Sequence, residues 1–216
     1  PRPAVVEQSE ELKNPALPAN LPPILLIAGT TMNAGKTTAI CEILRHFKRM
    51  GKNVAAAKCT GVSLLKDTLE MRDFGASRIM SFMDLGVITT SPSEGPSIVR
   101  AIIRTLAADK PDAILLELGD GILGTYGVPE IFKDEGIRDA ITALVMCGTD
   151  PVAAWGGVYL MKNRFGVTPV AISGPATDNA GGTGAAEREF GVPGINARLQ
   201  GELLAKTVLA ALEKGK

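Results

Sequence analysis

A turn that ends in Gly35-Lys36-Thr37 lies between an apolar run and a helical pattern near the start of the chain. The apolar run, residues 24–28, is typical of a buried strand, and the residues after Thr37 have the spacing of a helix. A turn in this position can wrap a polyphosphate with its main-chain N–H groups. Lys36 then reaches the outer phosphates, and the Thr37 hydroxyl binds Mg²⁺. These residue types at this spacing therefore predict that the chain binds a triphosphate.

The turn matches the phosphate-binding loop of P-loop NTPases except at one position. The usual pattern has a glycine separated by four residues from the Gly-Lys pair, but Thr30 stands there and Gly29 precedes it. The alternative is an ordinary strand–turn–helix with a chance Gly-Lys-Thr. The strand before the turn and the helix after it are the context that the motif requires, so we favour the phosphate-binding loop. The expected nucleotide contacts are Thr30, Asn33, Ala34, Gly35, Lys36, Thr37 and Thr38.

The composition is that of one globular α/β domain. The chain has 216 residues, of which 45% are hydrophobic and 21% charged, and this length supports a sizeable core. The net charge is zero and aromatic residues make up only 4%, so we expect neither a nucleic-acid-binding surface nor a stacking platform for single strands. No apolar run approaches the roughly 20 residues of a membrane span, and no signal peptide is visible. The three scattered cysteines fit buried thiols in a reducing compartment, so we expect a cytoplasmic protein.

The first 23 residues differ from the rest of the chain. They hold six of the 14 prolines together with several charges, which is typical of a linker or tail outside the core. We therefore expect a Pro-rich linker or tail over residues 1–23 and one P-loop nucleotide-binding domain over residues 24–216. The chain begins without Met, and an upstream domain that is missing from this chain is kept as an alternative.

Strand and helix patterns alternate from residue 24 onward. Because the expected strands are apolar and helices separate them, they predict a mainly parallel central sheet covered on both faces. The predicted architecture is therefore a three-layer α/β/α fold of the P-loop NTPase type. After the first strand, the expected strands are residues 54–58, 79–82, 113–117, 143–147, 169–172 and 192–196. The expected helices are residues 36–50, 64–75, 97–108, 129–140, a helix capped by Asp150, 185–190 and 198–213.

Ligands of such sheets bind beyond the carboxyl ends of the strands, and charged residues stand there. Lys58 ends the second expected strand, where its ammonium can hold an anionic substrate or a phosphate. Glu117 ends an otherwise apolar strand, in the place of the Mg²⁺-binding acid of P-loop proteins, and a buried carboxylate is costly without a cation or donor nearby. Asp67, early in a helix, is a second metal candidate, with stabilisation of the helix dipole as the alternative. The predicted Mg²⁺ ligands are thus Thr37, Asp67 and Glu117.

Two glycine-rich loops follow expected strands. We expect residues 119–127 to contact substrate, because glycines let a backbone approach a ligand closely, and Asp120 in this loop is an alternative acid. Residues 173–184 either hold the nucleotide base or a second anion, or serve as a plain connection. Asp150 is spaced like the Asp of a guanine-reading Asn-Lys-x-Asp loop. The Asn and Lys are absent and Asp150 is explained as a helix cap, so we favour ATP over GTP.

Three segments resemble dethiobiotin synthetase and its relatives. Residues 29–37 resemble their phosphate-binding loop, which also places Gly-Thr ahead of the loop and lacks the usual first glycine. Residues 54–58 followed by Gly61 are similar to the strand whose lysine holds the carboxylated substrate amine. Asp67 falls near the family's magnesium-binding aspartate. Residues 115–121 resemble its Val-Glu-Gly-Ala-Gly-Gly stretch, whose Glu binds magnesium.

The resemblance covers residues 24–128 and includes departures from the family pattern. Cys59 stands where the family has Pro after the lysine, Asp120 replaces a glycine, and nothing after Gly127 matches a substrate-binding pattern. Thr31 takes the place of the second loop lysine that marks the dimer-forming cell-division and metal-cluster ATPases. The resemblance therefore implies a dethiobiotin synthetase-like protein that is not dethiobiotin synthetase proper.

The resemblance implies an ATP-dependent enzyme of ligase or kinase type, with ATP and Mg²⁺ as cofactors. It would activate a carboxylate or carbamate of a small molecule by phosphoryl transfer, with Lys36 and Lys58 stabilising charge on the transferring group. Two other functions stay open: a nucleotide-regulated binding module with little turnover, and an acyltransferase whose loop grips the phosphates of coenzyme A. The expected partner is a small-molecule substrate, with a homodimer left open and neither nucleic acid nor membrane expected.

Overall fold

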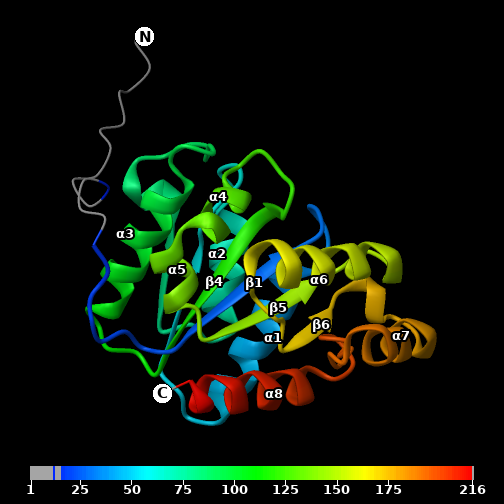
Figure 1. Cartoon of the computed structure of the whole chain (residues 1–216). Coiled ribbons are helices and arrows are strands. Elements are labelled where there is room, and N and C mark those ends of the chain that lie inside the picture. The colour runs from blue at the N-terminus through cyan, green and yellow to red at the C-terminus, as the bar shows by residue number, and fades with distance from the viewer. Residues whose placement is uncertain (1–11, 13–15, 216) are drawn as a thin grey trace.

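The computed structural model describes residue 12 and residues 16–215 of the chain. These residues form three layers, with a six-stranded sheet between two layers of helices (Figure 1). The strands pair in parallel in the order β3-β2-β4-β1-β5-β6. Their bounds are β1 Ile24–Gly29, β2 Val54–Lys58, β3 Arg78–Ser81, β4 Ala113–Gly121, β5 Ala143–Cys147 and β6 Ala171–Ser173. The predicted three-layer α/β/α fold is confirmed.

Helices cover both faces of the sheet because its central strand buries side chains on both. In β1, the side chains at 24, 26 and 28 belong to the core of one face, and those at 25 and 27 to the core of the other. This alternation follows from the two-residue period of a strand. The second core is completed by α1 (Lys36–Arg49), α2 (Leu65–Asp73) and α8 (Gly201–Lys214). The first is completed by α3 (Gly95–Ala107), α4 (Val128–Lys133), α5 (Glu135–Ala140), α6 (Pro151–Phe165) and α7 (Ala180–Phe190).

The path of the chain through the sheet changes direction at β1. After β1 the chain builds β2 and β3 on one side, returns through β4 beside β1, and then adds β5 and β6 on the other side. The register of β2 and β4 places Lys58 beside Glu117. Because the strands are parallel, the carboxyl ends of β1, β2 and β4 meet at one edge, where ligands of such folds bind.

The helix expected over residues 129–140 is two helices, α4 and α5, and this prediction is therefore wrong at its centre. The break lies at Asp134, whose backbone is extended. The Asp134 carboxylate accepts a hydrogen bond from the N–H of Ile137 and is paired with Arg100. A capping aspartate that is itself fixed by a cation stabilises a new helix start at this residue.

The segment after β6 also differs from the prediction. A short 3₁₀ helix, η3 (Pro175–Thr177), is followed by α7, which begins at residue 180 rather than 185. The Asn179 side chain accepts from the N–H of Gly182 and caps this start. Residues 192–196, expected as a last strand, contribute an isolated bridge between Ile172 and Gly194 and no named strand of the described chain.

Most of the predicted N-terminal linker, residues 1–11 and 13–15, lies outside the described residues. In the described remainder, Leu12, Leu17 and Leu21 are partly buried against the core. The division into a linker and a domain stays a prediction. The three cysteines are free and buried, as predicted. None of the helices in the part of the chain that the structure describes is long and apolar enough to cross a membrane.

Candidate functional site

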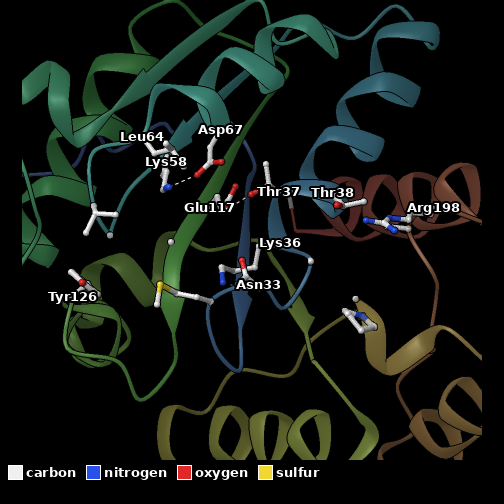
Figure 2. A pocket seen from close by; sticks show the side chains of 18 of the residues that line it. Asn33, Lys36, Thr37, Thr38, Lys58, Leu64, Asp67, Glu117, Tyr126 and Arg198 are labelled. Carbon is white, nitrogen blue, oxygen red and sulfur yellow. Dashed lines mark hydrogen bonds and ion pairs between the residues drawn. The ribbon is translucent and has the colours of Figure 1, made fainter.

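A cavity of about 430 Å³ opens at the carboxyl ends of β1, β2 and β4 (Figure 2). Its walls come from the turn after β1, the ends of β2 and β4, the first turn of α2 and the loops after β6. The structure therefore brings side chains that are far apart in the sequence to one place. The predicted site residues that line the cavity are Asn33, Gly35, Lys36, Thr37, Thr38, Lys58, Asp67 and Glu117.

Two other residues of the predicted loop do not line the cavity. Ala34 is fully buried in the core beneath the turn. The Thr30 side chain lies toward α6, because a Cβ added to Gly157 would come within 3.2 Å of the Thr30 Cγ2 atom. The main-chain N–H of Thr30 donates to the Cys147 carbonyl. Contact between these residues and a nucleotide stays a prediction.

The turn itself has the backbone of an anion cradle. Gly35 has a φ of +88° and Asn33 a φ of +61°, so the chain passes through left-handed conformations before α1 begins. No side chain caps the start of α1, and residues 35–38 line the cavity, so the first N–H groups of the helix are not taken up by a capping side chain. Gly174 closes against the turn from the loop after β6, since a Cβ at this residue would lie 2.2 Å from the Ala34 carbonyl oxygen. The cradle therefore needs glycine in two separate loops.

Lys36 lies across the cradle and is only 4% exposed. Its Nζ donates to the Thr31 carbonyl oxygen at 2.8 Å. Burial lowers the pKa of Lys36, while the nearby Glu117 carboxylate opposes that shift. The ammonium is thus held against the rim of the turn, within the cavity that a polyphosphate would enter.

Glu117 is a buried carboxylate of β4 that lines the cavity. It is 2% exposed, its Oε1 accepts from the Thr37 hydroxyl at 3.0 Å, and its Oε2 is buried without a partner among the described residues. Burial, together with the charge of Asp67, raises the pKa of Glu117 to about 7, against the opposing effects of Thr37 and the two lysines. A buried carboxylate with one free oxygen beside a threonine hydroxyl fits the hard-oxygen ligand set of Mg²⁺.

Lys58, which is buried, and Asp67, which is partly exposed, form a second polar pair in the cavity (Figure 2). The Lys58 ammonium hydrogen-bonds the Asp67 Oδ2 atom, so the two predicted residues engage each other. Asp67 also lies close enough to raise the pKa of Glu117 through its charge. Asp120, the alternative acid, does not line the cavity, and its carboxylate lies against Gly124 instead.

Two buried threonines connect the loops on this side of the cavity, and the sequence did not suggest either of them. The Thr60 Oγ1 atom accepts from the N–H of Gly119 at 2.8 Å. The Thr90 Oγ1 atom accepts from the N–H of Gly61 at 2.9 Å and donates to the Tyr126 carbonyl at 2.8 Å. Thr90 thereby joins the loop after β2 to the loop after β4. Its place beyond β3, with no motif around it, gave no signal for this role.

The opposite end of the cavity is lined by residues from the loop after β6 and the segment before α8, including Pro175, Asp178 and Arg198. Asn196 holds these two segments together. Its Nδ2 donates to the Asp178 Oδ1 atom at 2.9 Å, and its Oδ1 accepts from the N–H of Arg198 at 3.0 Å. Asp150 caps α6, as expected, and does not line the cavity. Sequence reasoning found the loop after β6 but missed Asn196 and Arg198.

Comparison with known proteins supports the fold but adds no sequence family. No protein-family model matches this chain, and no curated protein matches it. Among solved structures, chloroplast FtsY from Physcomitrella patens superposes with a TM-score of 0.56 at 16% identity, over 96% of this chain and 70% of that one. A DUF1611 family protein from Anabaena variabilis ATCC 29413 superposes with a TM-score of 0.59 at 17% identity, over 92% of this chain and 63% of that one. The signal recognition particle 54 kDa protein from Aeropyrum pernix K1, in complex with GDP, gives 0.52 at 16% identity, over 95% and 51% of the two chains.

At these identities the similarity establishes the fold alone. The chain has the three-layer architecture of P-loop NTPases. The narrower resemblance to dethiobiotin synthetase is carried by the sequence motifs and not by these structures.

Proposed function

We propose that this chain binds a Mg²⁺–nucleoside triphosphate in the cavity and transfers its outer phosphoryl group to a carboxylate or carbamate of a small molecule. The observation that carries the proposal is the Thr37–Glu117 pair, in which a buried carboxylate keeps one oxygen without a partner beside the phosphate-binding turn. A buried acid of this kind is costly unless a cation joins it. Mg²⁺ on the nucleotide would supply that cation.

Three oxygen-bearing side chains would hold the metal. Thr37 and Glu117 are already in contact, and Asp67 lines the same cavity. Mg²⁺ commonly takes one or two carboxylates and completes its shell with phosphates and water, so these ligands are sufficient. The bound metal would neutralise charge on the outer phosphates.

The chain's own residues would do the positioning. The N–H groups at the start of α1 would hold the phosphates in place, and Lys36 would stabilise the charge that spreads over the transferring group. Lys58, on the side of the cavity toward Tyr126, would hold the acceptor's anionic oxygen in line with the outer phosphate. In the transfer, the bond between the outer phosphorus and its bridging oxygen breaks as the acceptor oxygen bonds to phosphorus, and the nucleoside diphosphate leaves.

We infer that the nucleotide is ATP rather than GTP. Asp150 stands where a guanine-reading loop would place its aspartate, but its carboxylate accepts from the N–H groups of Val152 and Ala153. A carboxylate occupied as a helix cap is less available to a base. A GDP complex exists for the structural neighbour from Aeropyrum pernix, so ATP and GTP belong in the same experiment.

The test is calorimetric titration of the protein with ATP, GTP and coenzyme A, each with and without Mg²⁺. We expect Mg²⁺–ATP to bind tightest and Lys36→Ala to weaken it at least about 100-fold, because a charge-assisted contact to phosphate is lost. Lys133→Ala, on an exposed lysine of α4, is the matched control and should bind as the wild type does. Coenzyme A that binds tighter than ATP would favour the acyltransferase. Tight ATP binding without hydrolysis or transfer would favour the regulated binding module.

A further inference from the structure

The outward face of α6 carries large apolar side chains of which about half or more of the surface is exposed. We call residues Val152, Trp155, Gly156 and Tyr159 the α6 outer face; they follow helical spacing along one side of the helix. Val152 is 78% exposed, Trp155 48% and Tyr159 53%. The two rings stack with centroids 5.3 Å apart. This chain has one tryptophan and two tyrosines, so its only tryptophan and one of its tyrosines stand together in solvent.

The exposure of this face is not needed for packing α6 on the sheet. The other side of the helix already buries Ala154, Val158 and Met161 in the core. By contrast, α1, on the opposite face of the sheet, presents Arg45, Lys48 and other charged side chains to solvent. A surface helix normally has one apolar face, so a second one indicates a contact surface. Tryptophan and tyrosine are the residues that most often anchor such contacts.

The shape of the α6 outer face fits a second copy of itself. A Cβ added to Gly156 would meet no atom within 4 Å, so the helix has an open notch there, next to the ring of Trp155. In a two-fold symmetric pair the same patch faces itself. With the symmetry axis close to Gly156, an aromatic ring of each copy enters the notch of the other. Helices pack closely when side chains of one helix fit into gaps on the surface of the other.

The charges along α6 favour the antiparallel arrangement, which is one of the two helix orientations that a two-fold axis allows. Asp150 caps the N-terminal end, and Lys162 and Arg164 lie in the last turn. In an antiparallel pair each Asp150 lies near the partner's last turn. The two helix dipoles also run in opposite directions, which is favourable. A parallel pair would bring like charges together at both ends.

We propose that two copies of this chain form a dimer through their α6 outer faces. The helix has 15 residues and is about 22 Å long, so the pair buries less than a standard interface of about 800 Å² per partner. We therefore expect a reversible dimer with a dissociation constant in the micromolar range. This proposal does not rest on the proposed nucleotide chemistry, and either can fail alone.

The test is sedimentation velocity of the full chain over a concentration series, with tryptophan emission recorded on the same samples. Because Trp155 is the only tryptophan, its emission reports this face alone. We expect a monomer–dimer equilibrium, and an emission maximum that moves to shorter wavelength as the dimer fills. A chain that stays monomeric up to about 0.5 mM, with unchanged emission, overturns the proposal.

Two variants separate this interface from any other. Trp155→Ala removes the largest ring, and Gly156→Gln fills the notch while giving α6 a better helix former, so loss of the dimer there cannot come from a weakened helix. We expect each to raise the dimer dissociation constant at least tenfold. Leu199→Ala, at a residue 78% exposed outside α6, is the control and should leave it unchanged. A dimer that survives both α6 variants uses another surface and also overturns the proposal.

The antiparallel arrangement has its own test. Lys162→Glu, which lies one turn beyond Tyr159 and two turns beyond Trp155 on the same side of α6, places an acid near the partner's Asp150, so we expect it to weaken the dimer severalfold at low salt and less at high salt. A dimer that this variant strengthens would contradict the antiparallel arrangement.

Discussion

The two halves of the cavity are built in different ways. The half that would hold phosphates is built on one short turn and the start of one helix, with Thr37 bonded to Glu117 and with Gly174 packed directly against the turn. The half toward Tyr126 depends on hydrogen bonds between loops, in which Thr60 holds Gly119 and Thr90 holds Gly61. A local turn preserves its shape through its own backbone, whereas a wall of loops keeps its shape only while the loops stay joined. Substitution of a glycine, removal of the metal or loss of a charge should therefore disrupt the first half. Loss of a single buried hydroxyl should disrupt the second.

The largest expected effect is on the contact that closes the phosphate half. Gly174→Ala would place a Cβ 2.2 Å from the Ala34 carbonyl oxygen. We expect a loss of at least about 3 kcal/mol in the free energy of unfolding, measured by urea denaturation. Gly166→Ala is the matched control: φ is also positive there, but a Cβ meets nothing within 4 Å, so it should cost about 1–2 kcal/mol. Equal losses in the two variants would contradict this contact.

Next in size is the metal dependence of nucleotide binding. Glu117→Gln keeps the shape of the side chain but removes its charge, so we expect affinity for Mg²⁺–ATP to fall about 100-fold, or about 2.7 kcal/mol. Affinity for ATP without Mg²⁺ should stay the same or rise, because the buried negative charge no longer repels phosphate. Calorimetry in Mg²⁺ and in chelator separates the two. An equal loss in both conditions would mean that Glu117 acts on the fold and not on the metal.

The pH dependence of stability follows from the same carboxylate. The pKa of Glu117 is about 7 in the folded protein, above its ordinary value of 4.5, so the folded state holds more protons between these values. Stability without metal should then fall as pH rises, by about 2.5 kcal/mol between pH 5 and 8. Urea denaturation of the wild type and Glu117→Gln at each pH isolates this contribution. A difference between them that does not change with pH would contradict the raised pKa.

The smallest expected effect is on the half of the cavity toward Tyr126, where loops are joined by hydrogen bonds. Thr90→Val removes the acceptor of the Gly61 N–H and the donor to the Tyr126 carbonyl. We expect a loss of about 1–2 kcal/mol and faster amide exchange in residues 59–64 and 119–127. Affinity for Mg²⁺–ATP should change less than twofold.

Two further variants serve as controls for Thr90→Val. Thr90→Ser should restore slow exchange, because it keeps the hydroxyl. Thr207→Val removes an exposed hydroxyl that bonds within α8 and should change neither loop. Faster exchange confined to one of the two loops would show that Thr90 does not join them.

The same contrast explains what the sequence could predict. The turn before α1 and the acid in β4 were predictable because a short motif and a change from apolar to charged residues specify them locally. The end of the strand was not, since β4 continues past Glu117 to Gly121. The roles of Thr90 and Asn196 were not predictable, because their partners lie 18 to 36 residues away and no local pattern marks them. A hydroxyl or amide acquires such a role only when the fold brings loops together.

Local propensity also misled the prediction for one helix. Residues 180–184 hold three glycines, which favour a loop. They begin α7 because Asn179 caps the helix and because Gly182 packs where a Cβ would lie 2.0 Å from the Ala176 carbonyl oxygen. Close packing against η3 thus outweighs the low helix propensity of glycine.

The central claim is that the turn around Gly35 cradles a polyphosphate beside a metal-binding acid. A crystal structure of the protein grown with Mg²⁺ and a non-hydrolysable ATP analogue tests it most directly. We expect phosphate oxygens within hydrogen-bond distance of the main-chain N–H groups of residues 35–38, and Mg²⁺ bound to the Thr37 hydroxyl and the Glu117 carboxylate. A nucleotide bound elsewhere, or a turn whose N–H groups face away from it, would contradict the account.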